Sequence, residues 1–168
     1  MTSEVGIGST FVVEIPFEIA PPPEEFPVKE AAPSGDIHGL KLLLAEDNEL
    51  NAEIAETLLT DAGVHVTIVK NGKKAVDCFE AASPGTFDAI LMDVMMPVMD
   101  GLAATRAIRA IPRADARQIP ILAMTANAFE EDARQCLAAG MNVHLAKPLQ
   151  MDKVLAALME CCGKKRDL

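Results

Sequence analysis

The chain has 168 residues, which is enough for one domain of ordinary size and an additional segment. With 50% hydrophobic and 24% charged residues, it has the composition of a globular protein that builds a core. A formal net charge of -10 argues against direct contact with nucleic acid or an anionic membrane surface, and no stretch approaches the roughly 20 apolar residues of a membrane span.

The N-terminal part of the chain divides into two segments before residue 39. In residues 1–19, Gly6 and Gly8 predict a turn, and residues 10–15 are rich in β-forming side chains, so we expect a strand without an obvious partner. Residues 20–38 are rich in proline, a composition that cannot build a core and favours an extended linker.

From residue 39 to residue 163, strand and helix patterns alternate. In the first helix pattern, Leu50, Ile54 and Leu58 recur at helical spacing, and Gly63 marks the end. Five β-α units in succession predict an α/β fold, a doubly wound five-stranded parallel sheet with helices on both faces. The predicted strands are residues 40–45, 64–69, 87–92, 119–124 and 142–146, and the predicted helices are residues 49–62, 73–82, 102–111, 128–139 and 151–162, before a tail at 164–168.

Polar side chains follow four of these strands. Glu46 and Asp47 follow the first strand, Asp93 the third, Thr125 the fourth and Lys147 the fifth. The carboxyl ends of parallel strands meet at one edge of the sheet, so we expect these side chains to converge. Three carboxylates brought together repel one another, so protonation or a cation must relieve them, and oxygen ligands favour Mg²⁺ as that cation. Together with a lysine and a hydroxyl, this set fits phosphoryl transfer to Asp93 as the nucleophile.

Four segments together resemble the motifs of receiver (response-regulator) domains, especially those attached to hybrid histidine kinases. They are residues 42–51, 90–101, 124–128 and 140–148, and the resemblance covers about residues 39–162. It implies a flavodoxin-like sheet with strand order 2-1-3-4-5. It also implies a two-component phosphorelay function, in which the domain catalyses its own phosphorylation from a phosphohistidine and its own dephosphorylation.

The resemblance assigns a role to each residue of the acidic cluster. Asp93 would be the phosphoacceptor and would carry the aspartyl phosphate. Asp47 would bind Mg²⁺ directly, with Asp93 beside it, and Glu46 would bind mostly through water. The backbone carbonyl of Met95 would supply a further ligand.

The same resemblance assigns roles to residues of the later motifs. Lys147 would pair with Asp93 and then with the phosphoryl oxygens, and Pro148 would follow a cis peptide bond. Thr125 would donate its hydroxyl to the phosphoryl group and move the loop that follows. The face of the fourth helix, fifth strand and last helix would then repack, as a surface for a partner or a weak homodimer.

Three positions depart from the usual receiver pattern or tune it. His144 occupies the switch position where the family usually has Tyr or Phe, which indicates either pH-sensitive switching or a half-exposed side chain without a signalling role. Met95 and Asn127 flank the path of the attacking water in receivers. Because Met95 cannot orient water as a carboxylate or amide does, we predict a long-lived phosphoryl group.

Residues 6–17 are similar to the closing strand of histidine-kinase ATPase domains, so residues 1–19 are interpreted as a remnant of that domain. The chain then looks like the C-terminal part of a hybrid sensor histidine kinase that lacks the kinase core. Its partners would be the kinase domain of the same polypeptide and a histidine phosphotransfer protein. Its location would be cytoplasmic, and any membrane anchor of the parent protein would lie outside this sequence.

Three alternatives remain at this stage. One is a standalone single-domain response regulator. Another is an aspartate-nucleophile phosphatase, which is disfavoured because Met95 stands where such enzymes need a second Asp. The third is a degenerate receiver that only binds proteins, which the intact set of Asp93, Thr125 and Lys147 disfavours.

Overall fold

The structure is a computed structural model that describes residues 2–4, 6, 8–10, 14, 37–126 and 130–162. The chain forms two compact units, Met1–Ala31 and Ala32–Leu168. In the first unit, β1 (Thr2–Glu4) pairs with β2 (Gly8–Thr10) in an antiparallel hairpin. The strand predicted at residues 10–15 was expected to have no partner. That expectation is wrong at its start, because Thr10 lies in β2 opposite Thr2, and most of its remainder lies outside the described residues.

The second unit is built on a five-stranded parallel sheet with the order β4-β3-β5-β6-β7. Counted within the unit, this order is 2-1-3-4-5, which confirms the predicted doubly wound, flavodoxin-like fold. The strands are β3 (Lys41–Ala45), β4 (His65–Val69), β5 (Ala89–Asp93), β6 (Ile121–Thr125) and β7 (Val143–Ala146). The helices are α1 (Glu49–Asp61), α2 (Gly72–Ala81), α3 (Gly101–Ala110), α4 (Ala114–Gln118), α5 (Glu130–Ala139) and α6 (Met151–Cys162).

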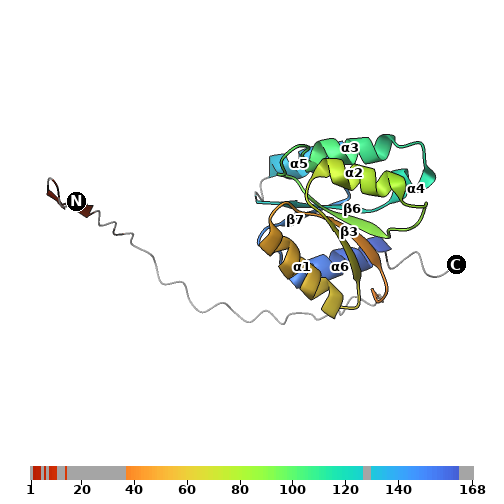
Figure 1. The fold of residues 1–168 in the computed structure, drawn as a ribbon, viewed down its shortest axis with the longest axis horizontal. Helices are drawn as coiled ribbons and strands as arrows, with labels where there is room; N and C mark the ends of the chain where they lie inside the picture. Colours follow the sequence, from red (N-terminus) through yellow and green to blue (C-terminus); the bar gives the residue numbers. More distant parts are fainter. Residues whose placement is uncertain are drawn as a thin grey trace. The chain divides into compact units, whose positions relative to one another are not determined.

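The core lies on both faces of the sheet, because β3, β5 and β6 each carry four successive buried apolar residues. Successive residues of a strand point to opposite faces, so Leu42 and Leu44 pack in one cluster and Leu43 and Ala45 in the other. Helices α1 and α6 cover the first face, and α2, α3, α4 and α5 cover the second (Figure 1). This sandwich leaves the carboxyl ends of the strands uncovered by helices.

Helix α1 packs on the sheet with a different face from the one that the apolar spacing indicates. Its buried residues are Ala52, Ala55 and Leu59. The periodic apolar residues that predicted the helix are instead exposed, Leu50 by 65%, Ile54 by 51% and Leu58 by 41%. The small alanines let the helix approach the sheet closely, and α1 therefore carries an apolar stripe on its outer surface.

The element boundaries differ from the prediction most at the starts of the third and fourth strands and in the segment between them. The third strand begins at Ala89 rather than residue 87, and the short helix α4 was not predicted. The start of the predicted helix at residues 128–139 falls partly on residues 127–129, which are not described. Among the helices that the structure describes, none has both the length and the apolar run needed to cross a membrane.

Candidate functional site

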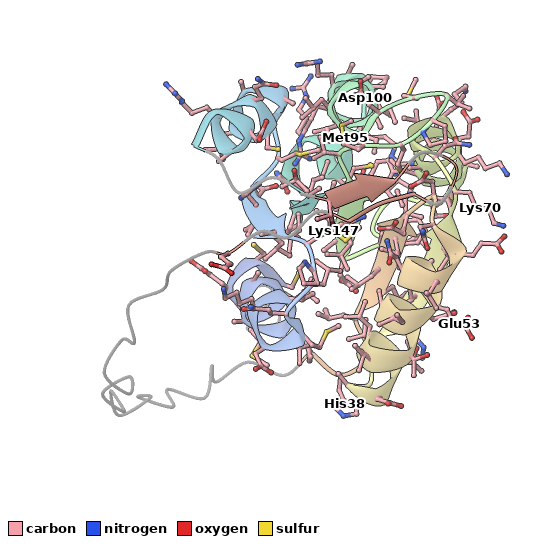
Figure 2. The ribbon with its side chains drawn as sticks, turned by 90° about the vertical axis from the view of Figure 1, so that its left-hand side faces the viewer. His38, Glu53, Lys70, Met95, Asp100 and Lys147 are labelled. Carbon is pink, nitrogen blue, oxygen red and sulfur yellow. The ribbon has the colours of Figure 1, made fainter. Side chains whose placement is uncertain are left out.

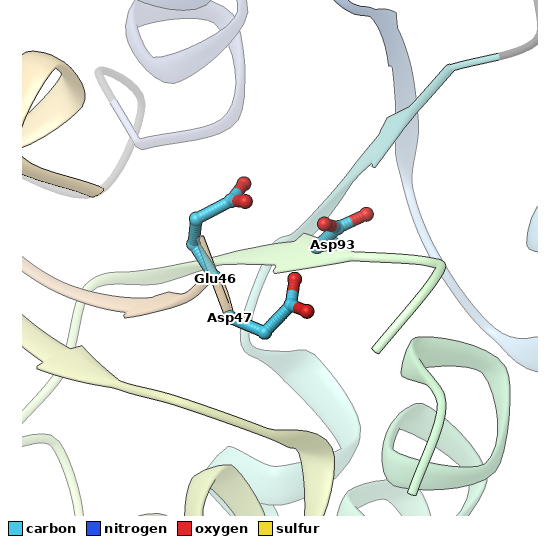
Figure 3. Close-up of side chains that lie close together, drawn as sticks. All are labelled: Glu46, Asp47 and Asp93. Atoms are coloured by element: carbon cyan, nitrogen blue, oxygen red, sulfur yellow. The ribbon is translucent and has the colours of Figure 1, made fainter. Parts of the chain in front are cut away.

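Three carboxylates meet at the carboxyl edge of the sheet, as the strand ends predict. Glu46 and Asp47 follow β3 directly, and Asp93 is the last residue of β5. One oxygen from each of the three lies within 4.8 Å of the others (Figure 3). Glu46 and Asp93 are buried, and Asp47 is exposed. The adjacent strands β3 and β5 are paired in register, which fixes the spacing of the cluster.

Lys147 supplies the cation of this cluster from the end of β7. Its Nζ donates to Glu46 Oε2 at 2.6 Å and to Asp93 Oδ2 at 2.7 Å. Its backbone N–H donates to the carbonyl of Thr125 at 2.7 Å, which ties β7 to the end of β6. The Lys147-Pro148 peptide bond is cis, as predicted.

The pKa values of the acceptor and its lysine reflect burial and mutual contact. Burial raises the pKa of Asp93 above its ordinary value, and the hydrogen bonds from Lys147 and the Met95 N–H oppose that rise without cancelling it. Burial also lowers the pKa of Lys147, but its hydrogen bonds to Asp93 and Glu46 and their charges outweigh burial and leave its pKa raised. The lysine is therefore held as a cation between two buried carboxyl groups.

The loop between β5 and α3 holds Asp93 from its other side. The Met95 N–H donates to Asp93 Oδ1 at 3.1 Å. The chain returns so closely at Gly101 that a Cβ there would lie 2.2 Å from the Asp93 carbonyl oxygen, so this position requires glycine. Between them, Val98 adopts φ 70°, a left-handed conformation that is strained for a β-branched residue. Met95 and Val98 are exposed by 73% and 84%. Met95 and Lys147, both labelled in Figure 2, each donate a hydrogen bond to the Asp93 carboxylate.

One partner of the cluster was not found from the sequence. The side-chain amide of Asn51 donates to Glu46 Oε1 at 3.1 Å, and the Asn48 N–H approaches the same oxygen at 3.4 Å. The available signal was the cap of α1, because an N-cap at Asn48 places Asn51 in the first turn beside the preceding strand end.

The remaining predicted residues are placed as follows. Thr125 is buried at the end of β6, next to β5 in the sheet. His144 is half-buried on β7 and lines a cavity of about 300 Å³ that Lys147 and Pro148 also line. Asn127 lies outside the described residues, so its tuning role stays a prediction.

The residues present fit a hard divalent cation. Three carboxylates offer oxygen ligands alone, two of them buried, and one edge of the cluster opens to solvent at Asp47. Mg²⁺ prefers such a site, where one or two carboxylates bind it and water completes its shell.

Comparison with known proteins identifies the family and the relatives. Residues 42–159 match the family of the response regulator receiver domain. The chain is 41% identical over 111 residues to hybrid signal transduction histidine kinase I of Dictyostelium discoideum, which covers 65% of this chain and 6% of that protein. It is 38% identical over 125 residues to the sensor protein GacS of Pseudomonas syringae pv. syringae, which covers 73% of this chain and 13% of that protein. The chain thus spans a small part of these relatives.

Two solved structures are similar over nearly their whole length. The receiver domain of the sensor histidine kinase PA1611 from Pseudomonas aeruginosa PAO1, solved with a magnesium ion in its active-site cleft, has a TM-score of 0.67 and 43% identity, covering 74% of this chain and 98% of that one. The receiver domain complex of Ssk1 with the histidine phosphotransfer protein Ypd1 from Saccharomyces cerevisiae gives a TM-score of 0.68 and 26% identity, covering 79% and 94%.

Proposed function

The chain belongs to the response regulator receiver domain family of phosphorelay signalling, and we propose that its Asp93 accepts a phosphoryl group from a phosphohistidine. The observation that carries this proposal is the buried Asp93 carboxylate within 2.7 Å of Lys147 Nζ and beside two further carboxylates. Phosphoryl transfer to a carboxylate needs an oxygen nucleophile, a cation for the incoming oxygens and carboxylates that can hold a metal, and this cluster brings all three together.

The reaction transfers a phosphoryl group between two protein side chains. An oxygen of Asp93 attacks phosphorus in line as the P–N bond of the donor breaks. The histidine nitrogen keeps the electron pair and takes up a proton, and the product is an aspartyl phosphate. Lys147 Nζ, which donates a hydrogen bond to Asp93 Oδ2, would follow the negative charge and donate to the phosphoryl oxygens. Thr125, buried at the end of the neighbouring strand, donates its hydroxyl there.

Asp47, Asp93 and the Met95 carbonyl would hold Mg²⁺, with Glu46 acting through water. When bound, this ion supplies positive charge to the phosphoryl oxygens. The acidic cluster and the magnesium ion of the similar PA1611 receiver domain support this assignment.

The switch would run from Thr125 to the face formed by α5, β7 and α6. His144 lies on β7 in that face, half-buried and beside the cavity at Lys147. New charge at Asp93 would draw Thr125 and the following loop inward, and His144 would repack behind it. The same face would serve a partner or a weak homodimer.

The phosphodonor would dock in a groove beside α1. This groove of about 430 Å³ is lined by Glu46 and Lys147 at its site end and by Ile54, Leu58 and Met151 further along. Because the donor nitrogen must reach Asp93, a donor protein must also cover this groove, whose exposed apolar stripe gives it a contact surface. A histidine phosphotransfer protein fits this role, and the Ypd1–Ssk1 complex supports it.

Docking and chemistry can be separated by one substitution. Ile54→Lys should slow transfer from a phosphorylated histidine phosphotransfer protein about tenfold or more, because it places a charge in the apolar contact. Labelling by acetyl phosphate, which needs no docking, should be unchanged. Ala81→Lys introduces the same charge at an exposed position on α2, which covers the other face of the sheet from α1, and should leave both rates unchanged. Equal rates for Ile54→Lys and wild type with the protein donor would refute this docking site.

Phosphorylation itself is tested by intact mass. The purified chain with acetyl phosphate and Mg²⁺ should gain one phosphoryl group, and Asp93→Asn or EDTA should abolish the gain. No gain with acetyl phosphate or with a phosphorylated histidine donor would refute the proposal and favour a protein-binding role.

Residues 1–19 are proposed to derive from the ATPase domain of a hybrid sensor histidine kinase. The support is the similarity of residues 6–17 to the closing strand of such domains and the hybrid kinases among the relatives. The kinase of the same polypeptide would then be the first phosphodonor, in the cytoplasm. A kinase domain joined to the receiver in the gene of origin would support this, and a receiver encoded alone would favour a single-domain response regulator.

A further inference from the structure

The first turn of α1 is assembled around one oxygen of Glu46. Asn48 is the N-cap, and its Oδ1 accepts the backbone N–H of Asn51 at 3.1 Å. In a capping box, the side chain three residues after the cap bonds back to the N–H of the cap residue. Here the Asn51 side-chain amide and the Asn48 N–H both donate to Glu46 Oε1 instead, at 3.1 Å and 3.4 Å. The helix cap thus holds a member of the acidic cluster.

The two oxygens of Glu46 have different partners. Oε2 accepts from Lys147 Nζ at 2.6 Å, and Oε1 accepts from Asn51. The Glu46 side chain is 3% exposed, so most of what holds its two oxygens comes from protein groups. Without the Asn51 amide, only the longer Asn48 contact would hold Oε1. The Glu46 carboxylate would then rotate more freely and would compete more strongly with Asp93 for the hydrogen bonds of Lys147 Nζ.

We propose that Asn51 is a positioning residue of the phosphoacceptor site. Its amide fixes the plane of the Glu46 carboxylate, so that Glu46 faces the water of the bound cation and shares Lys147 with Asp93. Partners of this kind, which orient groups around a metal, affect metal affinity although they do not touch the ion. The inference rests on the proposed function in one respect, the binding of Mg²⁺ at this cluster.

The first test measures Mg²⁺ affinity by calorimetry without a phosphodonor. Asn51→Ala should raise the Kd for Mg²⁺ about tenfold, whereas Asn51→Gln, which keeps the amide, should restore most of the affinity. Thr57→Ala is the matched control, because it removes a hydrogen bond to the Glu53 carbonyl on the same helix away from the site. Its Kd should be unchanged, and the unfolding midpoints of both alanine variants in EDTA should agree. Wild-type affinity in Asn51→Ala would overturn the proposal.

The second test needs no metal and separates this inference from the proposed function. In the metal-free chain, the side-chain amide protons of Asn51 should shift upfield in Glu46→Gln, because the charged acceptor is lost. Glu53→Gln, an exposed change on the same helix, should leave them in place. Unmoved Asn51 resonances in Glu46→Gln would overturn the inference whether or not Mg²⁺ binds. If the Asn51 resonances move in Glu46→Gln as expected but the wild-type chain binds no Mg²⁺, the contact between Asn51 and Glu46 stands. The magnesium assignment of the proposed function is then refuted instead.

Discussion

Replacing Lys147 by methionine tests how the buried carboxylates are balanced. Methionine keeps most of the apolar stem but removes the charge that bonds Glu46 Oε2 at 2.6 Å and Asp93 Oδ2 at 2.7 Å. Both acids are buried, and with Asp47 they lie within 4.8 Å of one another. Lys147→Met therefore leaves a cluster of like charges without a cation in the metal-free chain.

The expected loss follows from the burial of the cluster. Removing one partner of a buried ion pair costs about 3–5 kcal/mol, because the charge left behind is uncompensated. The Lys147 side chain is 21% exposed, so solvent reaches one end of the pair and the lower value applies. We expect a loss of about 3 kcal/mol in the free energy of unfolding, or roughly 10 °C in the midpoint.

Chemical and thermal unfolding in EDTA at neutral pH measures this loss. Lys153→Met makes the same change at an exposed position of α6 and should shift the midpoint little. Adding Asp93→Asn to Lys147→Met should recover stability, because it removes one of the repelling charges. Mg²⁺ at ten times its Kd should stabilise either chain by about 1.4 kcal/mol. A Lys147→Met chain no less stable than Lys153→Met would refute the charge-balance argument.

Two further predictions concern strain and protonation near the acceptor. Val98→Gly should stabilise the domain by about 0.5–1 kcal/mol, because Val98 is held at φ 70° and glycine removes that strain at a smaller entropic cost; an unchanged or lower melting temperature would contradict it. Burial raises the pKa of Asp93, so the folded chain binds its proton more tightly than the unfolded chain does. The resulting stability is fully present below the ordinary pKa of an aspartate and is lost as pH rises through the raised value. Urea unfolding in EDTA should show this loss in wild type and not in Asp93→Asn, and parallel pH profiles would count against it.

The fold was predictable because strand and helix patterns alternate and the three central strands are short, mostly apolar runs. The positions of Glu46, Asp47, Asp93 and Lys147 also followed from the sequence, since each comes directly after a strand and parallel strands end at one edge. The sequence predicts the topology, and the topology brings these four side chains to the same edge of the sheet.

Other features depend on packing that no local pattern records. Leu50, Ile54 and Leu58 predicted the helix correctly but lie on its exposed side, because α1 approaches the sheet through Ala52 and Ala55. Periodicity identifies an apolar face without saying whether the core or a partner covers it.

Helix α4 and the Asn51 contact were missed for different reasons. Helix α4, at Ala114–Gln118, is too short for a periodic signal, and Arg113 anchors its start with hydrogen bonds to Asp115 and the Ala82 carbonyl. Asn51 was included in a family motif without a role of its own. Its bond to Glu46 depends on how closely the first turn of α1 passes the end of β3, which only the structure shows.

The side chain at Met95 should affect how long the phosphoryl group stays on Asp93. Met95 is 73% exposed two residues after Asp93, and its thioether cannot orient an attacking water. An amide at this position would add about one hydrogen bond to that water, worth about 1 kcal/mol in the transition state, so Met95→Asn should hasten decay about fivefold. Val98→Asn, the same change at another exposed position of the loop, should leave the rate unaltered. Intact mass, followed over time after the phosphodonor is removed, measures the decay rate of each phosphorylated variant. If Met95→Asn and Val98→Asn decay alike, the side chain at Met95 does not set the lifetime, and control must lie with groups that approach the phosphoryl group from the Thr125 side.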